Sequence, residues 1–328
     1  MTDGRWQESA VLEFPATRHL SSETCYAAPV PRRSIPEKPP TAKRAIAIVG
    51  AGRLATFLAV ALRDAGFTIT EIIARDSPRS LGRARTLAAK VGAQAVTAHF
   101  AALDATLLWF CVPDGQIHLA ASALAAQLAR ANSKVKVRFA LHSSGALPSN
   151  ELDPLRLAGV AVASVHPLMT FVAGAHPSLT GVPFAIEGDD AAKRVARRIV
   201  RELGGESFSL PASRKAAYHA WATLTSPLLL AFLVTLEEAA CVAGFTRKDA
   251  RRKSLPIIRQ TLENYSRLGP ARSFSGPLIR GDAETVAKHL GVLKKHPGAR
   301  EVYITLARAA LRGLPAKNRD SLKRMLQT

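Results

Sequence analysis

Three histidines and one lysine stand where they could carry acid–base chemistry on a bound ligand. His142 opens HSSGALP (142–148), His166 lies in SVHPLMTF (164–171), and Lys215 and His219 occur in RKAAYHAWATLTSP (214–227). Histidine exchanges protons near neutral pH, and partial burial lowers the pKa of a lysine toward that range. We therefore take these four as candidate catalytic residues. The alternative for each is a structural role, as a hydrogen-bonded turn residue or as a polar helix end in solvent.

The helix expected to begin near residue 212 would place several polar groups on one face. Lys215, His219, Ala222 and Ser226 follow the spacing i, i+4, i+7 and i+11, and Tyr218 is adjacent. A lysine and a histidine one turn apart could supply a proton to a carbonyl or imine that is being reduced.

A glycine-rich segment, IVGAGRLA (48–55), has the pattern of a phosphate-binding turn between a strand and a helix. Gly50 would allow the tight turn, Gly52 would let a pyrophosphate approach the backbone, and Ala55 would let the helix pack closely. Free N–H groups at the helix N-terminus would bind the phosphates. We expect a dinucleotide site that includes Gly50, Gly52, Arg53 and Leu54; a glycine turn in an unrelated fold is the alternative.

The segment EIIARDSPRS (71–80) would select the nucleotide. A carboxylate at the end of the second strand would repel a ribose 2′-phosphate, whereas an arginine would pair with it. A hydrogen bond to a charged group contributes about 1.5–3 kcal/mol. Arg75, Ser77 and Arg79 therefore predict a pocket for NADP. NAD is the alternative, because Asp76 would face the ribose if the strand ended one residue later.

Strands and helices alternate along the first two-thirds of the chain. Strands are expected at 44–50, 68–74, 93–97, 106–112, 135–141, 160–165, 182–188 and 206–210, and helices at 53–65, 80–91, 115–130 and 189–204. This alternation predicts an α/β fold with a doubly wound parallel Rossmann sheet. After Pro211 the strand signals stop, and helices broken by glycine and proline predict an all-helical C-terminal domain.

Polar segments follow several predicted strands at the carboxyl ends, where such sheets bind ligands. CVPDGQI (111–117) would pass under the cofactor ribose, and HSSGALP would lie near the nicotinamide. The expected cofactor contacts there are Val112, Pro113 and Ser143, and the expected substrate contacts are Ser144, Ser226 and Arg280. Arg280 lies in the glycine–proline loop SGPLIRGD (275–282) and could bind a carboxylate; bracing of that loop is its alternative role.

The net charge of +20 first suggests nucleic acid or an acidic membrane as a partner. We interpret the basic runs 193–201 and 247–253 instead as solvated helix faces. An anionic cofactor and a small anionic substrate are the expected partners, with no nucleic acid and no membrane. Three widely spaced cysteines without CxxC spacing predict no disulfide framework and no metal site, and fit a cytoplasmic protein.

The ends of the chain differ in character from its middle. Residues 1–43 are rich in proline and charge and predict a disordered arm without a signal peptide. The most apolar segment, AWATLTSPLLLAFLVTL (220–236), holds three threonines, a serine and a proline. It falls short of the about 20 residues of a membrane span, so we predict a buried core helix. The expected domains are 1–43, a dinucleotide-binding domain over 44–211, and a helical domain over 212–328.

Over residues 44–312 the chain resembles the bacterial Rossmann-like proteins that carry the C-terminal domain of unknown function 2520. The resemblance rests on VGAGRLA, HSSGALP, SVHPLMTF, GVPFAIEGD, KAAYHA and GPLIRGDAETVAKHL, in that order. These proteins are relatives of pyrroline-5-carboxylate reductase, ketopantoate reductase and the deazaflavin-dependent NADP reductases. The resemblance implies NAD(P)-dependent oxidoreduction, closure of the helical half over the nicotinamide, and a homodimer formed through the long helix. It also implies a first module over about 44–168 and a second that starts near 180.

One position departs from the family pattern. An asparagine is expected after YHAWATLTS, and this chain has Pro227. Proline removes an N–H and kinks a helix, so either Ser226 takes over the contact or the chemistry is altered or lost. SVHP is also similar to the histidine–proline turn of prephenate dehydrogenases, which keeps an oxidative reaction open.

These observations predict an NADP-dependent oxidoreductase. It would transfer a hydride to the carbonyl or imine carbon of a small anionic substrate, an oxo acid or a cyclic imino acid. A non-catalytic NADP-binding sensor or scaffold protein is the alternative. A nucleic-acid-binding protein with a vestigial nucleotide fold is a third reading that rests on charge alone.

Overall fold

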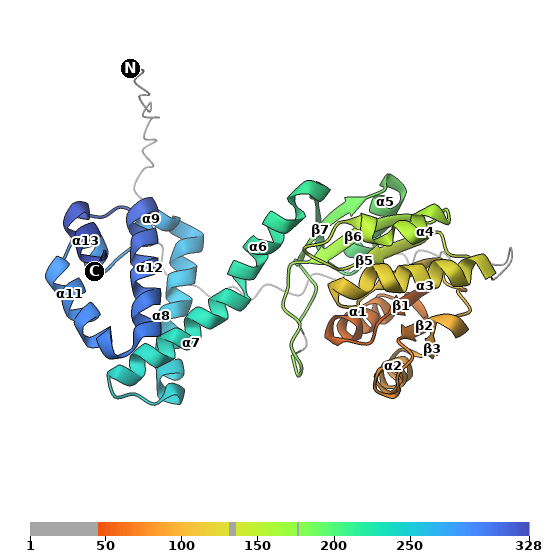
Figure 1. Cartoon of the computed structure of the whole chain (residues 1–328), viewed down its shortest axis with the longest axis horizontal. Coiled ribbons are helices and arrows are strands. Elements are labelled where there is room, and N and C mark those ends of the chain that lie inside the picture. Colours follow the sequence, from red (N-terminus) through yellow and green to blue (C-terminus); the bar gives the residue numbers. More distant parts are fainter. Residues whose placement is uncertain (1–44, 131–135, 176, 328) are drawn as a thin grey trace, which may run out of the picture. The chain divides into compact units, whose positions relative to one another are not determined.

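The computed structural model describes residues 45–130, 136–175 and 177–327 of the chain (Figure 1). The predicted disordered arm, residues 1–43, lies outside the described residues.

Eight strands form one sheet in the order β3-β2-β1-β4-β5-β6-β7-β8. Their bounds are β1 Ala45–Val49, β2 Thr68–Ala74, β3 Gln94–Thr97, β4 Leu107–Phe110, β5 Phe139–His142, β6 Ala161–Pro167, β7 Pro183–Gly188 and β8 Glu206–Ser209. Apolar residues fill β1 and β4 almost completely, as expected for parallel strands covered on both faces. The predicted doubly wound Rossmann sheet is confirmed.

One strand departs from the predicted all-parallel arrangement. β7 runs antiparallel to β6, with Val165 opposite Ile186. A parallel return needs a crossover, usually a helix, and the part of the 168–182 connection that is described contains none. Parallel pairing resumes between β7 and β8, because α5 (Asp190–Glu202) supplies the crossover between them.

Helices cover both faces of the sheet (Figure 1). α1 (Arg53–Asp64), α2 (Pro78–Val91) and α5 share one apolar core with the strands, to which they contribute Leu58, Leu87 and Ile199. α3 (Ile117–Arg130) and α4 (Asp153–Leu157) share the other core, through Ala121 and Leu155. The strand order reverses between β1 and β4, which places the expected ligand crevice at their carboxyl ends.

The chain from residue 215 onward is helical as far as it is described. Its helices are α6 Lys215–Thr225, α7 Pro227–Val242, α8 Arg247–Leu268, α9 Pro270–Ser273, α10 Pro277–Arg280, α11 Ala283–Val292, α12 Pro297–Gly313 and α13 Arg319–Met325. The helix expected from residue 212 therefore breaks at Ser226, where Pro227 begins a new helix, in line with the missing proline N–H. A small core, with Val286, Leu311 and Leu322 at its centre, joins α11, α12 and α13.

The prediction of a buried core helix at 220–236 is wrong for the single chain. The most apolar 18 residues of the helical stretch Ala212–Val242 have a mean hydropathy of 1.5, yet only 6% of this segment is buried. Leu228 and Leu230 are 50% and 63% exposed. By length and composition alone this stretch could also cross a membrane. A helix that is apolar all round is normally covered, yet within one chain the first five residues of α7, from Pro227 to Ala231, are exposed.

Candidate active site

A cavity of about 680 Å³ opens at the point where the strand order reverses. Val49, Gly50 and Gly52 line it from the end of β1, and Val112 and Pro113 line it from the end of β4. This volume lies within the roughly 300–1,000 Å³ of ordinary ligand pockets. The sequence motifs predicted four cofactor contacts among these residues, Gly50, Gly52, Val112 and Pro113, and the fold brings the four together.

The turn after β1 admits only glycine at its first position. Gly50 has φ +112°, and a Cβ there would lie 2.6 Å from the carbonyl oxygen of Cys111. Its N–H donates to the carbonyl of Ile73 at 2.8 Å. Gly52 is the N-cap of α1 and has no side chain to occupy the free N–H groups of the first turn. The backbone is thus cleared where a pyrophosphate would approach.

The two residues that follow the glycines lie elsewhere. Arg53 lines a different cavity, between α1 and residues 172–175 and 177–179, and Leu54 lines neither of the two. As the first residue of α1, Arg53 keeps its backbone N–H at the helix N-terminus.

The residues that line the cavity after β2 differ in part from those predicted to bind the 2′-phosphate. Arg75 and Asp76 both line it. Ser77 is the N-cap of α2, and its hydroxyl accepts from the Ser80 N–H. The exposed Arg79 is absent from the lining, whereas Arg83, one turn later, is present.

Sequence reasoning did not single out Arg83, because it considered only the residues directly after β2. Ser80 and Arg83 are three residues apart in α2 and share a face of the helix, which would have been the signal. His99 and Arg130 also line the cavity and were not predicted. Three arginines therefore surround the cavity, with Asp76 as its one lining carboxylate.

Lys215 is buried beside the carboxyl ends of β5 and β6. Its side chain is 1% exposed. Nζ donates to the carbonyl of Ser144 at 2.8 Å and to the hydroxyl of Ser164. Burial lowers the pKa of Lys215 to about 8, against the opposing attraction of Glu187 and Asp114. The ammonium ion therefore persists at neutral pH and fixes the turn that follows β5.

His142 is completely buried, and both of its ring nitrogens have partners. Nδ1 accepts from the N–H of Ser144 at 3.1 Å, which leaves Nε2 to donate to the carbonyl of Pro148 at 3.0 Å. Burial, reinforced by the charge of Lys215, lowers the pKa of His142 to about 3. No ring nitrogen of this neutral imidazole is left for a ligand, contrary to what an acid–base role requires.

His166 is half-buried, as is its neighbour His219. Its Nδ1 lies 2.9 Å from the phenolic oxygen of Tyr218, and its ring meets that of His219 edge-on at 5.9 Å. A Cβ added to Gly145 would lie 2.8 Å from His166 Nε2 and 2.5 Å from His219 Cδ2. Burial, with the charges of Lys215 and His219, lowers the pKa of His166 to about 4. Burial raises the pKa of Tyr218 to about 12.

The two serines after His142 are engaged within the protein. The Ser143 hydroxyl accepts from Trp109 Nε1 at 2.9 Å, and the Ser144 hydroxyl accepts from the N–H groups of Ala146 and Leu147. Both serine side chains are buried. The turn HSSGALP is therefore braced from within, and its glycine faces the two histidines.

Two predicted substrate contacts are not part of this cluster. Ser226 is exposed at the junction of α6 and α7, and Arg280 is exposed at the end of α10. No hydrogen bond or ion pair joins either side chain to Lys215, His166 or Tyr218 in the described part of the chain. Within the same residues, no group of three or more metal-binding side chains is found.

Sheet order, glycine turn and the polar cluster at the strand ends define a Rossmann-like α/β protein with a helical C-terminal extension. Comparison with family models divides the chain earlier, ahead of β7, so that β7, α5 and β8 fall in the second match. Residues 34–167 match the Rossmann-like domain, and residues 182–310 match the domain of unknown function DUF2520. The resemblance expected from the sequence motifs is confirmed. No curated protein matches the chain significantly.

Solved structures with this fold include several reductases. A candidate NADP oxidoreductase from Bacteroides fragilis aligns with a TM-score of 0.66 and 23% identity, over 81% of this chain and 97% of that one. A pyrroline-5-carboxylate reductase from Coxiella burnetii aligns with 0.52 and 17%, over 86% and 98%. An imine reductase from Myxococcus stipitatus in complex with NADP⁺ aligns with 0.59 and 13%, over 82% and 94%. The likeness extends over both parts of the fold.

Proposed function

We propose that this protein is an NADP-dependent oxidoreductase that reduces the carbonyl or imine carbon of a small anionic substrate, an oxo acid or a cyclic imino acid. The observation that carries the proposal is the cluster of Lys215, His166 and Tyr218 at the carboxyl ends of β5 and β6. It lies on the same edge of the sheet as the cavity at the ends of β1 and β4. Reductases with this fold support the reaction class.

The cavity fits NADP in shape and charge. Gly50 and Gly52 clear the backbone for a pyrophosphate, and Arg75 and Arg83 offer guanidinium groups to a 2′-phosphate. The reduced form, NADPH, would supply the hydride. Asp76 favours NAD instead, but two arginines outweigh one carboxylate in this part of the lining. Ser77 would act here through the cap it gives α2, and Ser143 through the turn it braces.

The neighbouring side chains suggest a division of labour around the substrate. At neutral pH His166 is uncharged and Tyr218 keeps its proton, because their pKa values are about 4 and about 12. The tyrosine hydroxyl would donate to Nδ1, so that Nε2 carries the remaining ring proton. That N–H would polarise the carbonyl or imine and deliver its proton as the hydride arrives, while the Tyr218 hydroxyl passes its own proton to Nδ1 and is later reprotonated from solvent. His219, whose ring lies beside that of His166, would also face the substrate.

Lys215 would act from a buried position behind His166 and Tyr218. Its charge would stabilise negative charge that develops on the substrate, and its hydrogen bonds would hold the 142–148 turn in place. We assign His142 a positioning role through Ser144 and Pro148, in place of the predicted acid–base role. The two parts of the chain meet at α6, which is consistent with domains over 44–211 and 212–328.

We also propose a homodimer formed through α7 and α8. Both helices expose large apolar side chains, among them Leu228, Leu230, Ile257 and Leu262, and a second copy would cover them. Arg280 remains our candidate for the substrate carboxylate, and a second copy is one way to bring it to the site. Analytical sedimentation of the wild type should show a dimer, and Leu230→Glu should weaken its association. A monomeric wild-type protein would refute the proposed dimer.

Parallel titrations with NADPH and NADH, followed by nicotinamide fluorescence, test the cofactor. Oxidation of NADPH by a panel of 2-oxo acids and cyclic imines then tests the reaction. Pro227 favours a second candidate, a non-catalytic NADP sensor, since it stands where an asparagine side chain was expected and the neighbouring Ser226 is exposed. Tight NADPH binding without turnover on any compound would select the sensor, and binding of neither nucleotide would refute both. We place the protein in the cytoplasm as part of this proposal.

A further inference from the structure

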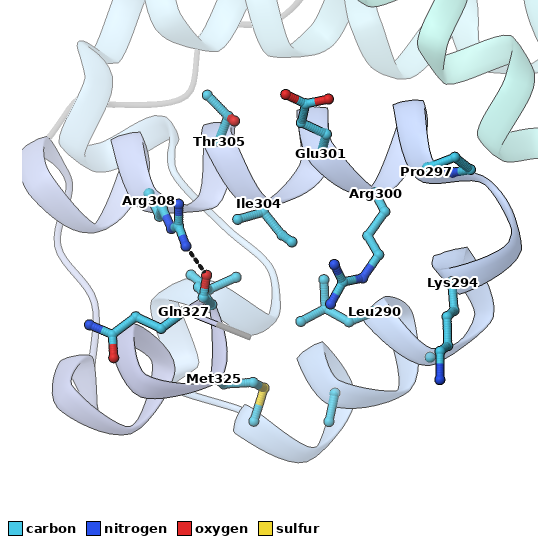
Figure 2. A pocket seen from close by; sticks show the side chains of 13 residues that line it. Leu290, Lys294, Pro297, Arg300, Glu301, Ile304, Thr305, Arg308, Met325 and Gln327 are labelled. Atoms are coloured by element: carbon cyan, nitrogen blue, oxygen red, sulfur yellow. Dashed lines mark hydrogen bonds between the residues drawn. The ribbon is translucent and has the colours of Figure 1, made fainter.

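A second cavity lies in the helical part of the chain, among α11, α12 and α13 (Figure 2). Its volume is about 910 Å³, which is sufficient for a small organic molecule. Leu290, Ile304, Met325 and Leu326 give it an apolar floor that adjoins the α11–α13 core. None of the residues proposed for oxidoreduction lines it.

The cavity is also strongly basic. Lys294, Arg300 and Arg308 line it, together with a single acid, Glu301. Figure 2 shows the guanidinium of Arg300 directed between α12 and α11 toward Leu290, and the carboxylate of Glu301 directed away from it. The field within the cavity is therefore positive above an apolar surface.

Arg300 is the informative residue, because it is half-buried and has no protein partner for its charge. Its side chain forms no hydrogen bond or ion pair within residues 45–130, 136–175 and 177–327, and the same holds for Lys294. Arg308, by contrast, donates to the carbonyl of Leu326 and thereby fixes the last turn of α13 at the edge of the cavity. A guanidinium aimed into a cavity without a counter-charge is suited to bind an anion from solution.

We infer that this cavity binds an amphipathic anion, a carboxylate or phosphate carried on an aliphatic body. Arg300 and Lys294 would hold the headgroup. Leu290, Ile304 and Met325 would cover the aliphatic body. The site is separate from the cavity at the sheet and does not depend on the reaction proposed there.

Calorimetric titration of the full chain at about 0.15 M salt, where exposed charges are screened, tests the inference. The ligands are octanoate, octyl phosphate and 1-octanol. One or both anions should bind, and 1-octanol should bind at least about tenfold more weakly, because a charge-assisted hydrogen bond contributes at least about 1.5 kcal/mol. The better anion identifies the headgroup. Failure of both anions to bind, or equal binding of 1-octanol, would overturn the proposal.

Variants then locate the site. Arg300→Gln should weaken binding of the anion about tenfold or more, and Lys294→Gln should weaken it in the same direction. Lys295→Gln is the matched control, since Lys295 is exposed and does not line the cavity. Because Arg300 holds no other part of the protein, Arg300→Gln should keep its melting temperature and its affinity for NADPH. Unchanged anion affinity in both Arg300→Gln and Lys294→Gln would place the ligand elsewhere and refute the assignment.

Discussion

The phenolic oxygen of Tyr218 and Nδ1 of His166 lie 2.9 Å apart, although 52 positions separate them in the chain. Tyr218 comes from α6 and His166 from β6, so this hydrogen bond joins the helical extension to the sheet. The same bond determines which ring nitrogen of His166 remains for a ligand.

Removal of the Tyr218 hydroxyl should therefore impair turnover without affecting the nucleotide. In Tyr218→Phe, Nδ1 of His166 loses its hydrogen-bond donor. The single ring proton can then lie on either nitrogen. We expect kcat to fall about tenfold or more, the order of a lost general acid–base contribution, with NADPH affinity unchanged. Steady-state kinetics and a fluorescence titration measure the two quantities. An unaltered kcat would remove the Tyr218–His166 pair from the mechanism.

The Lys215 ammonium should give stability a distinctive pH dependence. In the folded protein its pKa is about 8, against 10.5 for an ordinary lysine. Below pH 8 Lys215 is protonated in both the folded and the unfolded protein, so the full free-energy cost of burying its charge is present. Between about pH 8 and 10.5 the unfolded chain holds more protons, so stability rises with pH, by up to about 3 kcal/mol over the whole interval.

Denaturant unfolding of the wild type and Lys215→Met at pH 7.5 and 9.5 tests this sign. The wild type should gain stability relative to the variant as the pH rises. Burial of Cys111 raises its thiol pKa to about 12 and acts in the opposite direction, but it is common to both proteins and cancels. A difference in stability between the two proteins that stays constant with pH would show that Lys215 is not desolvated.

In activity assays Lys215→Met should lower turnover and leave NADPH affinity nearly intact.

Arg83 should contribute more than Arg79 to the choice between NADPH and NADH. Arg83 lines the nucleotide cavity and Arg79 does not, so Arg83→Ala should weaken NADPH about tenfold and leave NADH unchanged. Arg79→Ala is the control from the same helix and should leave both affinities unchanged. The reverse result, with Arg79 as the sensitive position, would restore the assignment made from sequence.

Gly145 should tolerate no side chain during catalysis. A Cβ at this position would meet His219 at 2.5 Å and His166 at 2.8 Å, so Gly145→Ala must displace at least one imidazole. We expect severe loss of turnover with NADPH affinity retained. Gly313→Ala serves as the control, because nothing lies within 4 Å of its added Cβ. Full activity of Gly145→Ala would show that neither imidazole has a required position.

Local sequence signals determined the nucleotide-binding half. The strand predicted at 68–74 coincides with β2, and the GxGxxA turn follows β1 as expected. These features are readable because a short apolar run predicts a buried strand, and because the GxGxxA pattern of the turn lies within a few consecutive residues. The antiparallel β7 was missed, since only the absence of a helix in the described part of 168–182 distinguishes it from a parallel strand.

The sequence by itself also identified His142, His166, Lys215 and His219 as chemistry-bearing residues, but it could not rank them. Tertiary structure separated them, because exposure and hydrogen-bond partners depend on segments distant in the chain. It buried His142 with both ring nitrogens hydrogen-bonded. It brought Lys215 into hydrogen bonds with Ser144 and Ser164, and placed His166 beside Tyr218 and Gly145. It likewise left apolar α7 exposed, because hydrophobicity dictates that a helix must be covered but not which surface covers it.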